Sequence, residues 1–141
     1  MKIETIQADL IDEFSMFDDW MDRYEHMIDL GKSLPLINPK LKTEDNIIKG
    51  CQSKVWLHAD LENERVMYTA DSDAIITKGI VAILIRVFSN QSPSTILNTN
   101  TDFIDEIGLK EHLSPTRANG LVSMVKKIKM YALAYQTQIE L

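Results

Sequence analysis

Hydrophobic residues near the start of the chain recur at alternating spacings of four and three. They are Leu10, Phe14, Phe17, Met21, Tyr24 and Ile28. This spacing is typical of an amphipathic helix, and we interpret the stripe as a core-packing face rather than a cofactor site. Ser15, with Asp18 three residues later, resembles a capping box, so a break into two helices is expected near Ser15. Gly31 is the expected C-terminal stop of the second helix.

The hydrophobic period changes to two in the middle of the chain. Alternate positions there are apolar: Val55, Leu57, Ala59 and Leu61. Period two predicts a strand with one buried face. A turn at residues 62–64 and a returning strand at residues 65–70 are expected to follow. Ile47-Ile48 is expected to form a further short strand before this pair.

The second half of the chain is predicted to be helical. Residues 74–89 are apolar nearly all round, which indicates the most buried helix, with Asp73 as its N-cap. Ser92-Pro93 and Ser114-Pro115 are each typical of an N-cap followed by proline at the first helical position. One or two short helices are expected between them, and a long helix after the second. One face of that last helix is apolar: Leu121, Met124, Val125, Ile128, Tyr131, Ala132 and Tyr135. The predicted fold class is therefore α+β, a small antiparallel sheet of about three strands packed against several helices.

Length and charge narrow the range of functions. The 141 residues, 45% of them hydrophobic, are expected to form a single domain over residues 1–141. The net charge of −6 argues against a nucleic-acid partner, because phosphate binding needs a cationic face. The basic cluster Lys126, Lys127 and Lys129 is interpreted as the solvated side of a helix.

No membrane or secretory segment is expected from the sequence. No apolar core of a signal peptide follows Lys2. The strongest apolar run, residues 75–88, is shorter than the roughly 20 residues that span a bilayer, and it contains Lys78 and Arg86. Together with a single unpaired cysteine, these features favour the cytoplasm, where thiols are kept reduced.

Cys51 is the only cysteine and the main candidate for chemistry. It cannot form an internal disulfide, a CxxC redox pair or a multi-thiolate metal site. Gly50 allows a sharp turn just before the thiol, and the polar neighbours Gln52 and Ser53 favour presentation on a loop. The alternative is a buried cysteine that acts as a small hydrophobe. The residues alone leave both interpretations open.

Three sequence blocks resemble the SufE family. The run from Gly50 to Trp56, Gly-Cys-Gln-Ser-Lys-Val-Trp, resembles the family signature. Residues 71–74 with Lys78-Gly79 resemble the family's turn into its central helix, and residues 113–121 resemble the entry into its last helix. The blocks occur in the family order, and the resemblance covers about residues 10 to 138. SufE proteins accept sulfur from pyridoxal-phosphate cysteine desulfurases during iron–sulfur cluster biogenesis, and their fold resembles that of IscU-type scaffolds.

The resemblance implies that Cys51 carries sulfur as a persulfide, with Gly50, Gln52 and Ser53 supporting its loop. It implies two partners, a SufS-type cysteine desulfurase and a downstream iron–sulfur scaffold. The chain would then be an activator and covalent carrier rather than a stand-alone enzyme, with no metal or organic cofactor of its own, since pyridoxal phosphate belongs to the donor. Whether it is a monomer or a homodimer stays open.

Two other functions are compatible with one thiol. An IscU-like cluster scaffold is one, although clusters are usually held by several thiolates. A single-cysteine redox protein is the other, although nothing beside Cys51 looks like a set of donors that activates a peroxide. The three histidines, His26, His58 and His112, are distant from Cys51 in sequence, and His58 is expected on the surface.

Arg117 and Asp73 are candidates for contacts with a partner. Arg117 is expected at about the third position of the last helix, where the helix dipole disfavours a cation. That placement suggests a specific role, such as pairing with a carboxylate or assisting a partner thiolate, against the alternative of a solvated arginine or a structural ion pair. Asp73 is first expected as a cap and second as a partner contact.

Overall fold

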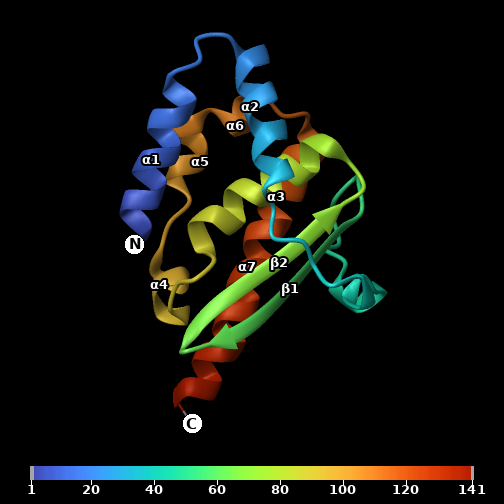
Figure 1. Cartoon of the computed structure of the whole chain (residues 1–141), viewed down its shortest axis with the longest axis vertical. Helices are drawn as coiled ribbons and strands as arrows, with labels where there is room; N and C mark the ends of the chain where they lie inside the picture. The colour runs from blue at the N-terminus through green and yellow to red at the C-terminus, as the bar shows by residue number, and fades with distance from the viewer. Residues whose placement is uncertain (1, 141) are drawn as a thin grey trace.

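The structure, a computed structural model, describes residues 2–140 apart from the side chain of Lys110, and it has an α+β fold (Figure 1). The helical elements are α1 (Ile3–Ser15), α2 (Trp20–Lys32), the 3-10 turns η1 (Pro39–Leu41) and η2 (Glu44–Asn46), α3 (Ile75–Phe88), α4 (Pro93–Asn98), α5 (Asp102–Ile107), α6 (Leu109–His112) and α7 (Pro115–Glu140). Figure 1 shows α1, α2, α5 and α6 at one end of the molecule, and the strands with most of α7 at the other. The break after Ser15 confirms the division of the first stripe into two helices.

The sheet is smaller than predicted. Within the described residues it contains two antiparallel strands, β1 (Val55–Glu62) and β2 (Arg65–Ser72), with Val55 opposite Ser72. The expected third strand at Ile47-Ile48 is reduced to an isolated antiparallel bridge between Ile47 and Trp56. The 3-10 turn η2 ends just before this bridge and a turn at Lys49-Gly50 follows it, so there is no room for a longer ladder.

Helix α3 is the central element of the core, as its sequence predicts. Ten of its fourteen residues are buried, and it packs against α1, α2, β2 and α7. Its start differs from the prediction: the N-cap is Ala74, which makes no side-chain cap bond, rather than Asp73. The carboxylate of Asp73 accepts a hydrogen bond from the backbone N–H of Lys54 instead. Across residues 2–140, the structure contains no helix that is both long and apolar enough to cross a membrane.

Helices α2 and α3 cross at two glycines, which corrects the expected stop at Gly31. Helix α2 continues to Lys32, and Gly31 lies in its last turn against the backbone of Gly79. A Cβ added at Gly79 would lie 2.4 Å from the carbonyl oxygen of Met27. The stripe on α2 is also rotated from the predicted one, because Met27 is buried whereas Met21 is exposed. Gly31 therefore serves a close helix crossing rather than a helix end.

Helix α7 is fixed along β1 and β2 by tyrosine hydroxyls. Tyr68 on β2 donates to the Ile128 carbonyl at 2.7 Å, and Tyr135 on α7 donates to the Ala59 carbonyl at 2.7 Å. The predicted cap of α7 is confirmed, since the Ser114 hydroxyl accepts from the Arg117 N–H at 3.3 Å. The tyrosine contacts hold the middle and second half of α7 along the strands, and the cap at Ser114 begins the turns that lie beside the loop carrying Cys51.

Candidate functional site

Cys51 lies in the loop between the Ile47 bridge and β1, and its thiol faces inward. Its side chain is half-buried. The thiol donates a long hydrogen bond to the carbonyl oxygen of Gly120 on α7, with Sγ and O 3.7 Å apart. The sequence left presentation and burial open, and the structure has elements of both: the cysteine is on a loop, but its sulfur is turned toward the body of the protein.

The thiol faces a small pocket between two helix N-terminal regions. Helix α3 contributes Thr77 and Ile80, helix α7 contributes Thr116, Arg117, Gly120 and Met124, and the loop itself contributes Gln52 and Ser53. The free volume is about 10 Å³, close to the space that one water molecule needs. The pocket thus has room for about one further atom beside Sγ.

Two glycines, Gly50 and Gly120, lie where the loop contacts α7. Gly50 has φ +93°, a left-handed backbone conformation that residues other than glycine rarely adopt. A Cβ at Gly50 would also lie 2.7 Å from the hydroxyl oxygen of Ser123. At Gly120, a Cβ would lie 3.4 Å from the Cys51 sulfur and 3.6 Å from its Cα. Glycine is therefore required on the loop side of the contact, at Gly50, whereas a Cβ at Gly120 would make ordinary van der Waals contacts with Cys51.

The far end of the loop is tied to the junction of β2 and α3. The Lys54 N–H donates to Asp73 Oδ1 at 3.0 Å, and the Asp73 N–H donates to the Lys54 carbonyl at 3.3 Å. The Ser72 hydroxyl donates to the same carbonyl at 2.8 Å. Asp73 is itself exposed, so its second carboxylate oxygen is open to a partner while the first supports the loop.

Burial sets the electrostatic state of the thiol. It raises the pKa of Cys51 above its ordinary value, because the thiolate would lose hydration in the pocket. Thr77 and Thr116, from the first turns of α3 and α7, line the same pocket, and the positive ends of these helix dipoles act on the thiol in the opposite direction to burial. Arg117 is half-buried at the pocket wall, and no carboxylate among the described residues forms an ion pair with it. In the resting protein Cys51 is a neutral thiol.

The histidines lie away from the thiol. His26 contacts Glu13, His58 contacts Asp60, and His112 stacks on Trp20. His58 is partly buried, with a quarter of its side chain exposed, rather than fully at the surface. Among the described residues, no group of three His, Cys, Asp or Glu side chains is arranged to hold a metal ion. The site thus consists of one thiol, its loop and the two helices beneath it.

Sequence reasoning identified the loop but missed the surface on which it lies. Gly120, Ser123 and Met124 come from α7, about seventy residues later, and Thr77 and Ile80 come from α3. One signal was available, since a glycine inside a predicted helix costs about 1 kcal/mol relative to alanine. Gly120, directly before the apolar stripe of this helix, is such a glycine, and Cys51 is the residue that lies against it.

Comparisons with known proteins give one consistent result. The family described as "SufE: Fe-S metabolism associated domain" matches residues 8–132. An uncharacterized SufE-like protein of Rhizobium meliloti is 44% identical over 128 residues, which cover 87% of this chain and 91% of that protein. One of Synechocystis is 38% identical over 129 residues, covering 92% of this chain and 81% of the relative.

A plant relative and a solved structure extend the comparison. SufE-like protein 1 of Arabidopsis thaliana, named as chloroplastic/mitochondrial, is 39% identical over 119 residues, covering 84% of this chain but 32% of the longer plant protein. The solution structure of a hypothetical protein from Thermus thermophilus has the same fold, with a TM-score of 0.78, 20% identity, and coverage of 94% of this chain and 96% of that one. From the family match and from relatives 38–44% identical over most of its length, the chain belongs to the SufE family, whose domain is associated with iron–sulfur metabolism.

Proposed function

We propose that this protein accepts sulfur from a SufS-type, pyridoxal-phosphate-dependent cysteine desulfurase and carries it as a persulfide on Cys51 toward an iron–sulfur scaffold. The observation that supports the proposal best is the position of the thiol. Cys51, the only cysteine, lies on a loop next to Gly50, and its sulfur faces a pocket with a free volume of about 10 Å³. The family membership supplies the metabolic context.

The transfer exchanges one sulfur–sulfur bond for another. The Cys51 thiolate attacks the outer sulfur of a persulfide on the donor cysteine. A new S–S bond forms on Cys51, the donor S–S bond breaks, and its electron pair leaves on the donor sulfur as a thiolate. The proton lost by Cys51 balances the one that the donor thiolate takes up. No external oxidant or reductant is needed.

The raised pKa of Cys51 has a clear consequence for this step. In the seated loop the nucleophilic thiolate is scarcer than in a free cysteine, which already has only a few per cent thiolate near neutral pH. Attack therefore requires the loop to leave the pocket when the donor docks. Arg117, charged and without an ion-pair partner among the described residues, lies where it can attract the emerging thiolate or the partner's sulfur. Asp73 is the second partner-facing candidate, through its exposed oxygen.

The same seat protects the product. A persulfide in open solution would be reduced by cellular thiols before delivery. The pocket between Ile80, Gly120 and Met124 holds about one additional atom, and a slight widening accommodates the outer sulfur away from solvent. This need for shelter fits a reducing compartment, which we propose to be the cytoplasm.

Intact mass measurement tests the proposal. The protein is incubated with a SufS-type desulfurase and cysteine, separated from free cysteine, and weighed before and after dithiothreitol. We expect one added sulfur atom, removed by dithiothreitol and located by peptide mapping on the peptide that contains Cys51. Desulfurase turnover should rise in the presence of the protein.

The matched control is Cys51→Ser, which replaces the sulfur and leaves the loop and pocket. It should take up no sulfur while keeping its circular dichroism spectrum and unfolding temperature, because Cys51 is a half-buried loop residue that packs against the core and is not one of its fully buried members. Absence of sulfur from the wild-type protein contradicts the proposal. Unfolding of Cys51→Ser would instead show that the cysteine is a structural core residue.

A further inference from the structure

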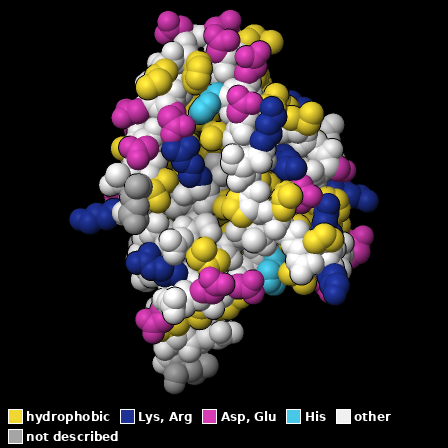
Figure 2. Space-filling view, in the orientation of Figure 1, with side chains coloured by type: hydrophobic (Ala, Val, Ile, Leu, Met, Phe, Trp, Pro, Cys, Tyr) yellow, Lys and Arg dark blue, Asp and Glu magenta, His cyan; other side chains and the backbone are white. Residues whose placement is uncertain are grey.

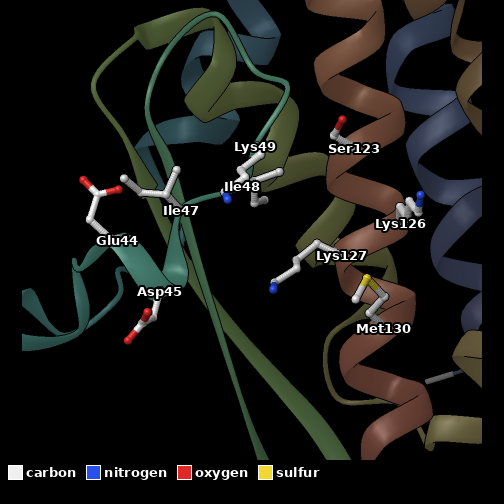
Figure 3. A pocket seen from close by; sticks show the side chains of 9 residues that line it. All are labelled: Glu44, Asp45, Ile47, Ile48, Lys49, Ser123, Lys126, Lys127 and Met130. Carbon is white, nitrogen blue, oxygen red and sulfur yellow. The ribbon is translucent and has the colours of Figure 1, made fainter.

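A groove on the other side of the Cys51 loop is not used by the chemistry described above. It lies between residues 44–49 and helix α7, has a volume of about 470 Å³, and is lined on the helix side by Ser123, Lys126, Lys127 and Met130 (Figure 3). Lys49 lines the groove and Cys51 lines the sulfur pocket, only two positions later. The seat of Gly50 on Ser123 separates the two hollows. The groove is therefore adjacent to the pocket that holds the Cys51 thiol.

The interior of the groove is cationic. Figure 3 shows the Lys127 side chain extending from α7 toward residues 44–48, and the Lys49 side chain extending into the same space, whereas Lys126 points away. The carboxylates of Glu44 and Asp45 lie at the outer lip and point away from α7. Within the described residues, neither Lys49 nor Lys127 forms an ion pair. Two ammonium groups thus share a hollow in which the lining carboxylates, Glu44 and Asp45, form no ion pair with them.

The walls of the groove are partly apolar. Ile47 lies on the loop side, and Met130, 55% exposed, lies on α7. An exposed methionine beside uncompensated lysines is more typical of a contact surface than of a solvated helix face, because methionine adapts to varied partners. The groove therefore fits a segment that brings an acidic side chain to Lys49 and Lys127 and an apolar side chain to Met130. Lys126 is exposed and points away from the groove, as expected for the solvated side of a helix, so the proposal changes the expected role of Lys127 alone.

The charge distribution of the whole chain makes this cationic hollow selective. Residues 1–32 contain nine acidic and three basic side chains, so they account for the entire net charge of −6, and the other residues carry twelve of each sign. Figure 2 shows acidic side chains gathered over the α1–α2 end of the molecule. An acidic partner surface is repelled from that end and attracted to the groove, and such complementarity orients an encounter.

Resting on the proposed function, we propose that this groove docks an acidic–apolar surface segment of the sulfur-donating desulfurase. The segment places a carboxylate between Lys49 and Lys127 and an apolar side chain on Ile47 and Met130. Engagement at Lys49 also acts on the backbone next to Gly50, so docking in the groove and release of the Cys51 loop are mechanically connected.

The test compares two charge-reversal variants of equal net charge. The groove variant carries Lys49→Glu and Lys127→Glu. The control variant carries Lys32→Glu and Lys40→Glu, two exposed lysines outside the groove. Persulfide formation on Cys51 is measured by intact mass against protein concentration, with a SufS-type desulfurase and cysteine as the probe. We expect the groove variant to need about tenfold more protein for half-maximal transfer than the control, with a similar maximal rate, because reversal turns two attractions into repulsions. The difference should shrink at about 0.5 M sodium chloride, where charges are screened over a few ångströms.

Three measurements separate docking from other effects. Lys127 Nζ lies 5.3 Å from the Tyr131 ring centroid, so thermal unfolding of both variants checks that the fold is kept. The single variant Lys49→Glu, at an exposed position, should show part of the increase in the protein concentration needed for half-maximal transfer. Alkylation of Cys51 by iodoacetamide without desulfurase checks intrinsic thiol reactivity. Equal concentration dependence for groove and control variants overturns the groove proposal while leaving the proposed function intact. A lower maximal rate with unchanged half-saturation also overturns it. A wild-type protein that takes up no sulfur refutes the proposed function itself.

Discussion

Gly50 offers the sharpest perturbation of the site, because its backbone and its surroundings both require glycine. Alanine there would have to adopt φ +93°, and its Cβ would lie 2.7 Å from Ser123 Oγ. The left-handed conformation alone costs about 1–2 kcal/mol for a residue with a Cβ, and the Ser123 contact adds to it. Leaving the pocket relieves both costs, so Gly50→Ala should shift the loop toward its open state.

The expected size follows from that energy. A shift of about 1–2 kcal/mol changes an equilibrium roughly 5- to 30-fold. If alkylation proceeds through the open loop, iodoacetamide should modify Cys51 in Gly50→Ala about 5- to 30-fold faster than in the wild type. The double variant Gly50→Ala/Ser123→Ala removes the close oxygen but keeps the backbone strain. Its alkylation rate should therefore lie between those of the wild type and of Gly50→Ala.

Gly108 provides the matched control. It also has a left-handed backbone, φ +88°, but a Cβ there would make only ordinary contacts at 3.6 Å with Arg23 and Trp20. Gly108→Ala should lower the unfolding temperature without accelerating alkylation of Cys51. If Gly50→Ala is alkylated no faster than the wild type, or if Gly108→Ala is accelerated equally, then Gly50 does not control how often the Cys51 loop leaves its pocket.

Four further predictions concern the thiol, its neighbours and the fold. The rate of Cys51 alkylation should rise with pH around an apparent pKa above the roughly 8.5 of free cysteine, since burial raises the pKa, and an unfolded control should titrate lower. Arg117→Gln should slow sulfur transfer severalfold without changing the unfolding temperature, because Arg117 has no ion-pair partner among the described residues; an unchanged transfer rate would remove it from the site. The hydrogen bonds from Arg86 lower the pKa of Glu13, so Glu13→Gln should cost about 1 kcal/mol of unfolding free energy at pH 7. This difference should vanish as the pH falls below the unfolded carboxyl pKa of about 4.3. A pH-independent difference would refute the ion pair between Glu13 and Arg86 as its source. Anaerobic incubation with iron and sulfide followed by desalting should leave a nearly colourless protein, because one thiolate per chain is too few for a stable cluster; a stoichiometric brown product would favour a scaffold.

Local chemistry made several elements predictable. An all-round apolar run of this length indicates a buried helix, and α3 is one. Ser-Pro pairs cap their own helices whatever surrounds them, and both Ser92 and Ser114 accept the expected backbone hydrogen bond. The period of two likewise identified β1 and β2. In each case the determining interactions lie within a few residues of each other.

The errors arose where a distant segment decides the outcome. Gly31 is a residue type that often ends a helix, but here it lets α2 approach Gly79 on α3. Asp73 is a residue type that often caps a helix N-terminus, but its carboxylate accepts a hydrogen bond from the backbone N–H of Lys54, nineteen residues earlier. The half-buried state of Cys51 depends on Ile80 and Gly120, which line its pocket and which no local pattern connects to it. Tertiary contacts of this kind compete with local preferences and cannot be read from spacing alone.

A single-turnover transfer experiment shows whether Cys51 accepts sulfur from the desulfurase. A desulfurase is loaded once with sulfur from labelled cysteine, freed of substrate, and mixed with this protein without any reductant. We expect the label lost by the desulfurase to appear in equal amount on the Cys51 peptide, and none to appear in Cys51→Ser. Label that stays on the desulfurase, or that appears only as free sulfide, would show that Cys51 does not accept the sulfur.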